Sequence, residues 1–401
     1  MGGYGVLVEG PVRRGRRWWR WLRGLLAFIV LLALIFFAGG GWYFSEQIRN
    51  DALRIDEPSP PDYSLRVVGV GDGTLTFALG EDPPDDLLSS EILGVVWEGG
   101  YGQVGKVVSR DGTSVARTFT SITGTPAVGE DVALDAFAFP NDPEAVGIDW
   151  ENVVYESGVG PAAAWYVAGE RSTWAIFVHG RGVHPGEALR ALPTFVEAGF
   201  PALLITYRND EGATGSEDRL ARFGVTEWED LEGAVGYALD AGAEDVVLVG
   251  YSMGGAIIAS FLLHSGFAGK VEAAILESPA LDLGAMIDAR AADTELPLVS
   301  LPVPAPLTWT AKWIASLRFG VDWSEVDYVA RAGEFTTPML IIHGTEDHDV
   351  PISVSEEFAD SAPAGLVTLV PFEGAGHVRA WNTDPERYRR VLEGFLAGIE
   401  G

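Results

Sequence analysis

The chain has 401 residues, is 47% hydrophobic and carries a formal net charge of −30 at pH 7. Its length favours more than one structural unit, and its hydrophobic content allows a substantial core. The sequence contains no cysteine, which excludes a disulfide framework and a cysteine-based metal site, and its acidic excess argues against nucleic acid as a partner because it would repel phosphates.

The N-terminal residues reverse the charge of the rest of the chain. Residues 1–23 carry six arginines and one acid, Glu9, whereas residues 24–44 carry no charge and are continuously apolar at their centre. A helix of this length, rising about 1.5 Å per residue, spans roughly 30 Å, the thickness of the bilayer's hydrocarbon core. Aromatic side chains flank the stretch as they do at membrane interfaces, namely Trp18, Trp19, Trp21, Trp42 and Tyr43.

We therefore predict a single-pass transmembrane helix at residues 24–44, with the lipid bilayer as its partner. Arginines favour the cytoplasmic side of a membrane, so residues 1–23 are expected to be cytoplasmic and the acidic body extracytoplasmic. The alternative is a cleaved signal peptide. The length of the apolar run and the lack of a clear Ala-x-Ala after it stand against cleavage.

Two segments separate the apolar stretch from the rest of the chain. Residues 45–62 are polar and then proline-rich, which predicts a stalk. Residues 63–150 contain short β-type runs divided by turn signals such as Gly71-Asp72-Gly73, which predicts a small β-rich module. We see no catalytic constellation in this module and expect it to act as a scaffold.

The pattern changes over residues 151–401, where apolar strand-like runs alternate with amphipathic helical ones. Continuous apolar strands separated by helices indicate a mostly parallel sheet with helices on both faces, a three-layer α/β architecture. Residues 280–335 interrupt this alternation with four prolines and three tryptophans. We expect this insertion to form a cap over a pocket, with an ordinary peripheral helix pair as the alternative.

The most informative motif is Gly-x-Ser-x-Gly at Gly250, Ser252 and Gly254, between an apolar run and a helical pattern. A sharp strand-to-helix turn lifts its serine off the sheet edge as a nucleophile, and small neighbours permit such a turn. By itself the motif also fits a glycine-rich turn, since the chain has 50 glycines. Ser252 therefore needs chemical partners elsewhere in the sequence.

A serine nucleophile needs a base, and the base needs a group that orients it. His377 lies in a Gly-x-Gly-His loop just after the strand-like run 367–370, and we assign it as the base. Asp347 follows the apolar run 339–342 on a turn, from which a short carboxylate can reach the imidazole. Asp347 is our preferred acid, and Asp349 is the reserve.

The chain order Ser252, Asp347, His377 is the order found in α/β-hydrolases. The elbow, the His-Gly-Thr-Glu-Asp loop that begins at His343 and the Gly-x-Gly-His loop all match that pattern, so residues 151–401 resemble the α/β-hydrolase superfamily. The resemblance implies an α/β-hydrolase fold with a cap insertion, preceded here by the transmembrane helix and the β-rich module.

The resemblance also implies an oxyanion hole. The segment His179-Gly-Arg181-Gly occupies the place of the family's oxyanion loop, so the backbone N–H groups of Arg181 and Met253 are the expected donors. His179 is expected to fix this loop rather than to act as base. Asn209 and Asp210 stand where the family often has glycine, which leaves the shape of the cleft on that side open.

Together these features predict a membrane-anchored, extracytoplasmic serine hydrolase acting on a small-molecule or lipid ester. An oligopeptidase-like serine peptidase uses the same triad and is the alternative, and a non-catalytic envelope scaffold is a third reading. No cofactor is expected. His343 and His348 lie near acids but lack the spacing of a metal motif, so no metal is expected either.

Overall fold

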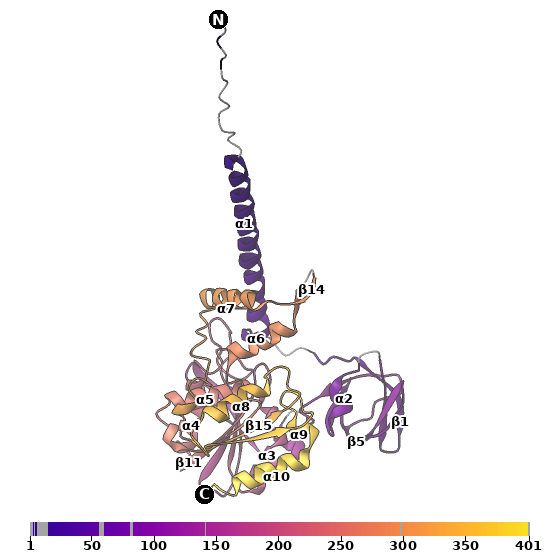
Figure 1. The fold of residues 1–401 in the computed structure, drawn as a ribbon. Helices are drawn as coiled ribbons and strands as arrows, with labels where there is room; N and C mark the ends of the chain where they lie inside the picture. Colours follow the sequence, from indigo (N-terminus) through magenta and orange to yellow (C-terminus); the bar gives the residue numbers. More distant parts are fainter. Residues whose placement is uncertain are drawn as a thin grey trace.

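The computed structural model describes residues 3, 5, 15–55, 60–80, 83–140, 142–296 and 299–399. It begins with a long helix, α1 (Gly15–Ile48), which continues into a π-helical turn, η1 (Arg49–Leu53). Figure 1 shows α1 standing away from the body, and most of its large apolar side chains are exposed. The stretch Trp18–Leu53 has the length and composition of a membrane span, properties that a signal sequence shares.

The end of α1 is embedded in the body, which differs from the stalk predicted at residues 45–62. Ile48 and Leu53 are buried in the main hydrophobic core, and Ala221 N–H donates to Leu53 O across 2.6 Å. The prediction weighed the polar residues of this segment and missed its few apolar side chains, whose burial fixes the segment to the body. Residues 56–59 of the predicted stalk lie outside the described residues.

Six antiparallel strands close a small barrel in the order β1-β2-β5-β4-β3-β6. Their bounds are Leu65–Gly71 (β1), Thr74–Ala78 (β2), Leu93–Trp97 (β3), Gly100–Arg110 (β4), Ser114–Thr123 (β5) and Asp131–Asp135 (β6). A short helix, α2 (Asp85–Ser89), precedes β3, and a 3₁₀ turn, η2 (Pro143–Val146), leads to the main sheet. Alternate side chains such as Val67, Phe77 and Val95 fill the barrel. The expected small β-rich module is therefore present.

The main sheet has eight strands in the order β16-β15-β12-β11-β9-β10-β8-β7. The two strands at one edge, β7 and β8, are antiparallel to each other, and β8 is also antiparallel to β10. The other six strands run parallel to one another, namely β10, β9, β11, β12, β15 and β16. Their bounds are Glu151–Ser157 (β7), Gly160–Val167 (β8), Thr173–Val178 (β9), Ala202–Ile205 (β10), Asp245–Tyr251 (β11), Val271–Glu277 (β12), Met339–Gly344 (β15) and Val367–Phe372 (β16).

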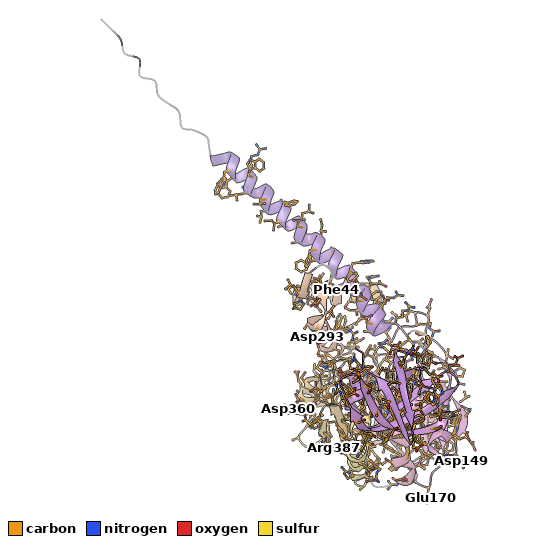
Figure 2. All side chains as sticks on the ribbon, turned by 90° about the vertical axis from the view of Figure 1, so that its right-hand side faces the viewer. Phe44, Asp149, Glu170, Asp293, Asp360 and Arg387 are labelled. Atoms are coloured by element: carbon orange, nitrogen blue, oxygen red, sulfur yellow. The ribbon has the colours of Figure 1, made fainter. Side chains whose placement is uncertain are left out.

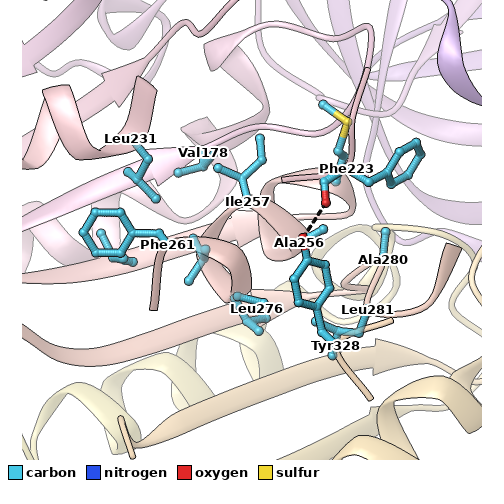
Figure 3. Close-up of a cluster of buried hydrophobic side chains, with 14 of the residues drawn as sticks. Val178, Phe223, Leu231, Ala256, Ile257, Phe261, Leu276, Ala280, Leu281 and Tyr328 are labelled. Atoms are coloured by element: carbon cyan, nitrogen blue, oxygen red, sulfur yellow. Dashed lines mark hydrogen bonds between the residues drawn. The ribbon is translucent and has the colours of Figure 1, made fainter. Parts of the chain in front are cut away.

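Helices cover both faces of the main sheet (Figure 1). One face carries α4 (Trp228–Asp240), α5 (Met253–His264) and α8 (Ile352–Ser361), and the turn η4 (Ala268–Lys270) follows α5. The other carries η3 (Pro185–Arg190), α3 (Leu192–Glu197), α9 (Ala380–Thr383) and α10 (Pro385–Leu396). Figure 3 shows part of the first core, where Phe261 and Ile257 lie near Leu276, and the Tyr328 hydroxyl donates to Phe223 O across 2.7 Å. These layers confirm the predicted three-layer α/β architecture.

An insertion separates β12 from β15. It consists of α6 (Leu283–Asp293), a small hairpin of β13 (Glu295–Leu296) and β14 (Val299–Pro302), α7 (Ala305–Phe319) and η5 (Ala332–Glu334). Figure 1 places α6, α7 and β14 at the end of the body from which α1 emerges. In Figure 2, Phe44 of α1 and Asp293 of α6 are labelled at this junction. The insertion therefore contacts the N-terminal helix as well as the main sheet's core.

Candidate active site

Ser252 occupies the sharp turn between β11 and α5. Its backbone φ is 49°, a strained value for a residue with a side chain. A Cβ at Gly254 would lie 2.0 Å from Val178 O, and one at Gly250 would lie 2.8 Å from the Gly254 carbonyl carbon. Only glycine fits these two positions, and the tight turn they allow lifts the serine hydroxyl off the sheet edge.

The structure brings Ser252, Asp347 and His377 together. They follow β11, β15 and β16, whose carboxyl ends share one edge of the parallel sheet. His377 Nδ1–H donates to Asp347 Oδ2 across 2.9 Å, and His377 Nε2 accepts from the Ser252 hydroxyl across 2.9 Å. The carboxylate thus holds the imidazole in the tautomer that can take the serine proton.

The Asp347 carboxylate is organised for this task. Its Oδ1 accepts the backbone N–H groups of Asp349, across 3.0 Å, and Val350, across 2.8 Å, while Oδ2 faces His377. Burial by itself raises the pKa of Asp347, but hydrogen bonds from His343 and His377 outweigh it and hold that pKa well below its usual range. Asp347 is therefore ionised throughout the neutral pH range.

Burial lowers the pKa of His377, and the Asp347 carboxylate more than offsets it, so the net pKa is raised. The reserve acid, Asp349, does not contact His377 in this way. Its side chain is 58% exposed and lies 3.3 Å from the Arg290 guanidinium. The geometry favours Asp347 over Asp349 as the partner of the imidazole.

The predicted oxyanion donors lie on two sides of the serine. Met253 begins α5, and the first amides of a helix have no intrahelical acceptor. The loop after β9 passes so close that a Cβ at Gly180 would be 3.3 Å from the Ser252 Cβ. The Arg181 guanidinium is bound to the segment that follows α1, since it donates to Asp51 O across 2.6 Å and to Arg54 O across 3.1 Å.

Comparison with known proteins identifies the family and agrees with the fold. The sequence model of the alpha/beta hydrolase family matches residues 175–391, more than half of the chain. The chain belongs to the alpha/beta hydrolase family. A monoacylglycerol lipase of Mycolicibacterium smegmatis is 24% identical over 227 residues, which cover 50% of this chain and 80% of that protein.

Solved structures of the alpha/beta hydrolase fold match as well. An esterase of Pyrococcus furiosus superposes with a TM-score of 0.50 and 17% identity, covering 65% of this chain and 97% of the esterase. A second crystal form of the same esterase gives a TM-score of 0.51 at 17% identity, covering 66% and 96% of the two chains. At this identity the likeness concerns the fold.

Several residues that hold the loop after β9, where the oxyanion donor Arg181 is predicted, were missed in the sequence. The buried Glu187 carboxylate accepts Gly180 N–H across 2.7 Å. Asp210 contacts His179 Nε2 at 2.9 Å, and the Tyr207 hydroxyl donates to Gly180 O across 2.8 Å. His179 is thus occupied within the loop, as expected. The position of Asp210 was noted only as a departure from glycine, and no sequence signal marked Glu187.

A cleft of about 810 Å³ opens beside His377 and has the barrel as its second wall. The barrel side contributes Pro84, Asp85, Asp86, Leu88, Ser89 and Leu134, and the hydrolase side contributes Glu346, His348, Asp349, Gly374 and Gly376. The Asn382 amide fixes the two walls together by donating to Ile92 O and Ala136 O. The barrel therefore shapes the approach to the candidate base, a role that its sequence did not indicate.

Among the described residues, no group of three or more His, Cys, Asp or Glu side chains is arranged to hold a metal ion. Both ring nitrogens of His343 are engaged in hydrogen bonds within the protein. Its Nδ1 lies 2.8 Å from Ser355 Oγ, and its Nε2 donates to Val350 O across 2.9 Å. The ring thus supports the loop that carries Asp347.

Proposed function

We propose that the chain is a serine hydrolase that cleaves a carboxylic ester of an acyl or lipid substrate. The observation that carries the proposal is the hydrogen-bonded series from Ser252 through His377 to Asp347, with both distances at 2.9 Å. The monoacylglycerol lipase named above supports an ester as the scissile bond and a lipid as the substrate.

In this proposal Ser252 Oγ attacks the ester carbonyl carbon while His377 Nε2 accepts the hydroxyl proton. The backbone N–H groups of Arg181 and Met253 stabilise the resulting oxyanion, a contribution of about 100- to 1,000-fold in rate for each donor. The carbon–oxygen bond to the alcohol then breaks, and His377 returns the proton to that alcohol. Water, deprotonated by His377, then attacks the acyl carbon. The bond from this carbon to Ser252 Oγ breaks, His377 returns the proton to Oγ, and the carboxylic acid leaves.

We further propose that α1 anchors this enzyme in a membrane, with residues 1–23 cytoplasmic and the catalytic body outside. The arginines before the apolar stretch support this orientation, and the tryptophans at both of its ends support the span itself. Carbonate extraction of membranes tests the anchor, because the intact chain should stay with the lipid pellet. Release of the intact chain into the supernatant would remove the anchor from the proposal.

A fluorophosphonate probe tests the nucleophile. The wild-type chain should be labelled, and Ser252→Ala should not be, while the neighbouring Ser278→Ala should keep its label. Absence of labelling in folded wild-type protein would refute both the esterase and the serine peptidase hypotheses. The hypothesis of a non-catalytic scaffold would then remain.

A substrate comparison separates the two enzyme classes. Short- and long-chain p-nitrophenyl esters should be hydrolysed much faster than aminoacyl amides. The reverse order would favour the oligopeptidase-like alternative. The peptidase alternative was suggested by the additional β module ahead of the hydrolase domain. This module forms one six-stranded barrel and not a propeller of several blades.

A further inference from the structure

Helix α7 of the insertion has an apolar face that no part of the described chain covers. Trp309, Trp313 and Leu317 are 67%, 55% and 69% exposed. They follow one another at intervals of four residues, so they share one side of the helix. Large contiguous apolar surfaces of this kind are uncommon on soluble proteins and mark a site of contact.

The opposite side of α7 is also apolar and faces the hydrophobic core, through Ala311 and Ala315, and α1, through Leu307. Leu307, Ala311 and Ala315 are buried there. A helix that is apolar on two opposite sides is stable when each side has an apolar environment. The core and α1 supply the apolar environment for the inner side of α7. The outer side, with its two tryptophans, needs a second apolar environment.

The position of α7 indicates which environment this is. The helix crosses α1 where the uncharged stretch ends, since a Cβ at Gly41 would lie 2.7 Å from the Thr310 side chain and 3.0 Å from that of Ile314. Figure 1 shows α7 lying across the direction of α1, at the level where α1 leaves the body. If α1 crosses a bilayer, α7 therefore lies along its surface.

The charges of α7 fit a membrane surface. Although the chain carries 57 acidic residues, none lies in α7. Its two cations are turned toward the protein, because Lys312 lies 2.7 Å from Asp288 and Arg318 forms an ion pair with Glu46 of α1. The Arg318 guanidinium also lies 3.9 Å from the ring centroid of Trp42. The outward side of α7 consequently presents tryptophan and leucine without charge, the composition of an interfacial helix.

We propose that α7 lies in the headgroup region of the bilayer, with Trp309, Trp313 and Leu317 inserted at the boundary of the acyl chains. This second contact, which rests on the proposed anchoring by α1, holds the insertion against the membrane. The body then has two fixed points on the bilayer, so the orientation of the cleft beside His377 is fixed as well. A lipid surface is favoured over a protein partner because the exposed side of α7 continues the apolar surface of α1.

Site-directed labelling of the full chain tests the proposal, and the absence of cysteine allows single labels without a background. An environment-sensitive fluorophore is attached to Trp313→Cys in phosphatidylcholine vesicles containing some phosphatidylglycerol. Its emission should shift to the blue, and lipids with nitroxide-labelled headgroups or shallow acyl positions should quench it. Leu31→Cys within α1 serves as the membrane control, and Glu170→Cys, at the far end of the body in Figure 2, serves as the aqueous control.

The controls separate the two proposals. Quenching at positions 31 and 313 but not at 170 supports the α7 contact. Quenching at 31 alone refutes it and leaves the anchor intact, and a blue shift at 313 without lipid quenching also refutes it, in favour of a protein partner or a second copy. Failure of quenching at 31 removes the anchor and the α7 contact together.

A functional measurement adds an independent readout. The double variant Trp309→Gln, Trp313→Gln should hydrolyse a water-soluble short-chain ester as the wild type does, since neither side chain contacts the candidate site. Its turnover of monoacylglycerol embedded in vesicles should fall by at least about tenfold, because the burial of each of the two large apolar side chains contributes about tenfold or more to the membrane-binding equilibrium. Val154→Gln, which alters another exposed apolar side chain, is the matched control. Equal turnover of vesicle substrate by all three proteins would overturn the proposal.

Discussion

Replacing Asp347 with asparagine tests the assignment of the catalytic acid. Two backbone N–H groups bind Oδ1 of the native carboxylate, so the asparagine carbonyl oxygen must occupy that position. The amide NH₂ then takes the place of Oδ2 and points at His377 Nδ1. Because an NH₂ group only donates, Nδ1 must become the acceptor and the ring proton moves to Nε2, where it faces Ser252 and prevents the ring from accepting the serine proton.

The expected loss is large. An inverted tautomer in a triad costs about 10⁴-fold in kcat. This factor corresponds to about 5 kcal/mol of transition-state stabilisation. The packing of the loop should be preserved because asparagine retains the two backbone hydrogen bonds, so the thermal unfolding midpoint should change little compared with activity.

The assay measures kcat and KM on a soluble p-nitrophenyl ester for the wild type, Asp347→Asn and Asp349→Asn. Asp349 is the matched control, since its exposed carboxylate pairs with Arg290 at the surface. Asp349→Asn should remain within about threefold of wild type, as is typical of removing an exposed ion pair. The reasoning is refuted if Asp347→Asn stays within tenfold of wild type, and a large loss in Asp349→Asn would transfer the acid role to that residue.

Three further predictions follow from the same structure. Because Asp347 raises the pKa of His377, kcat/KM should fall on the acid side with a midpoint above the ordinary histidine value of about 6.5, and a rate that stays constant down to pH 5 would contradict this. Arg181→Ala should lower kcat by up to about tenfold by releasing the oxyanion loop, with little change in KM, whereas unchanged kinetics would show that the loop is held without it. Arg117→Met should destabilise the barrel by about 2–6 kcal/mol in denaturant unfolding, since it removes the donor of four backbone carbonyls, and the two buried ones, Leu87 O and Ser90 O, each cost about 1–3 kcal/mol when unsatisfied. The control is Arg66→Met, which removes an exposed ion pair with Asp131 and should lower the free energy of unfolding by no more than about 1 kcal/mol. Equal destabilisation by Arg117→Met and Arg66→Met would refute the argument.

The parts of the site that could be predicted are those that follow directly from strands. Parallel strands buried on both faces have continuous apolar sequences, and functional loops begin where these sequences end. Ser252, Asp347 and His377 each occupy such a loop, and the structure brings them within hydrogen-bonding distance. Their proximity could thus be inferred from chain order and strand ends, while their chemical roles stay a proposal.

The supporting contacts could not be predicted because they depend on side chains that meet only in the folded chain. Glu187 reaches Gly180 N–H from η3, and no local pattern distinguishes its carboxylate from the many others in this acidic sequence. The error over the stalk has a related cause. Ile48 and Leu53 are two apolar side chains in a polar segment, and only the surface they contact shows that they are buried.

The hydrogen bonds from Arg181 to Asp51 O and Arg54 O decide where the chain can be truncated at its N-terminal side without loss of contacts in the body. The sequence suggests a soluble fragment that begins near residue 63, after the proline-rich segment. Such a fragment would lose Leu53 from the core and leave the Arg181 guanidinium without those two carbonyl acceptors. A truncation within α1, which keeps the chain from Trp42 onward, retains both. The boundary of the folded hydrolase therefore lies inside α1, upstream of Leu53.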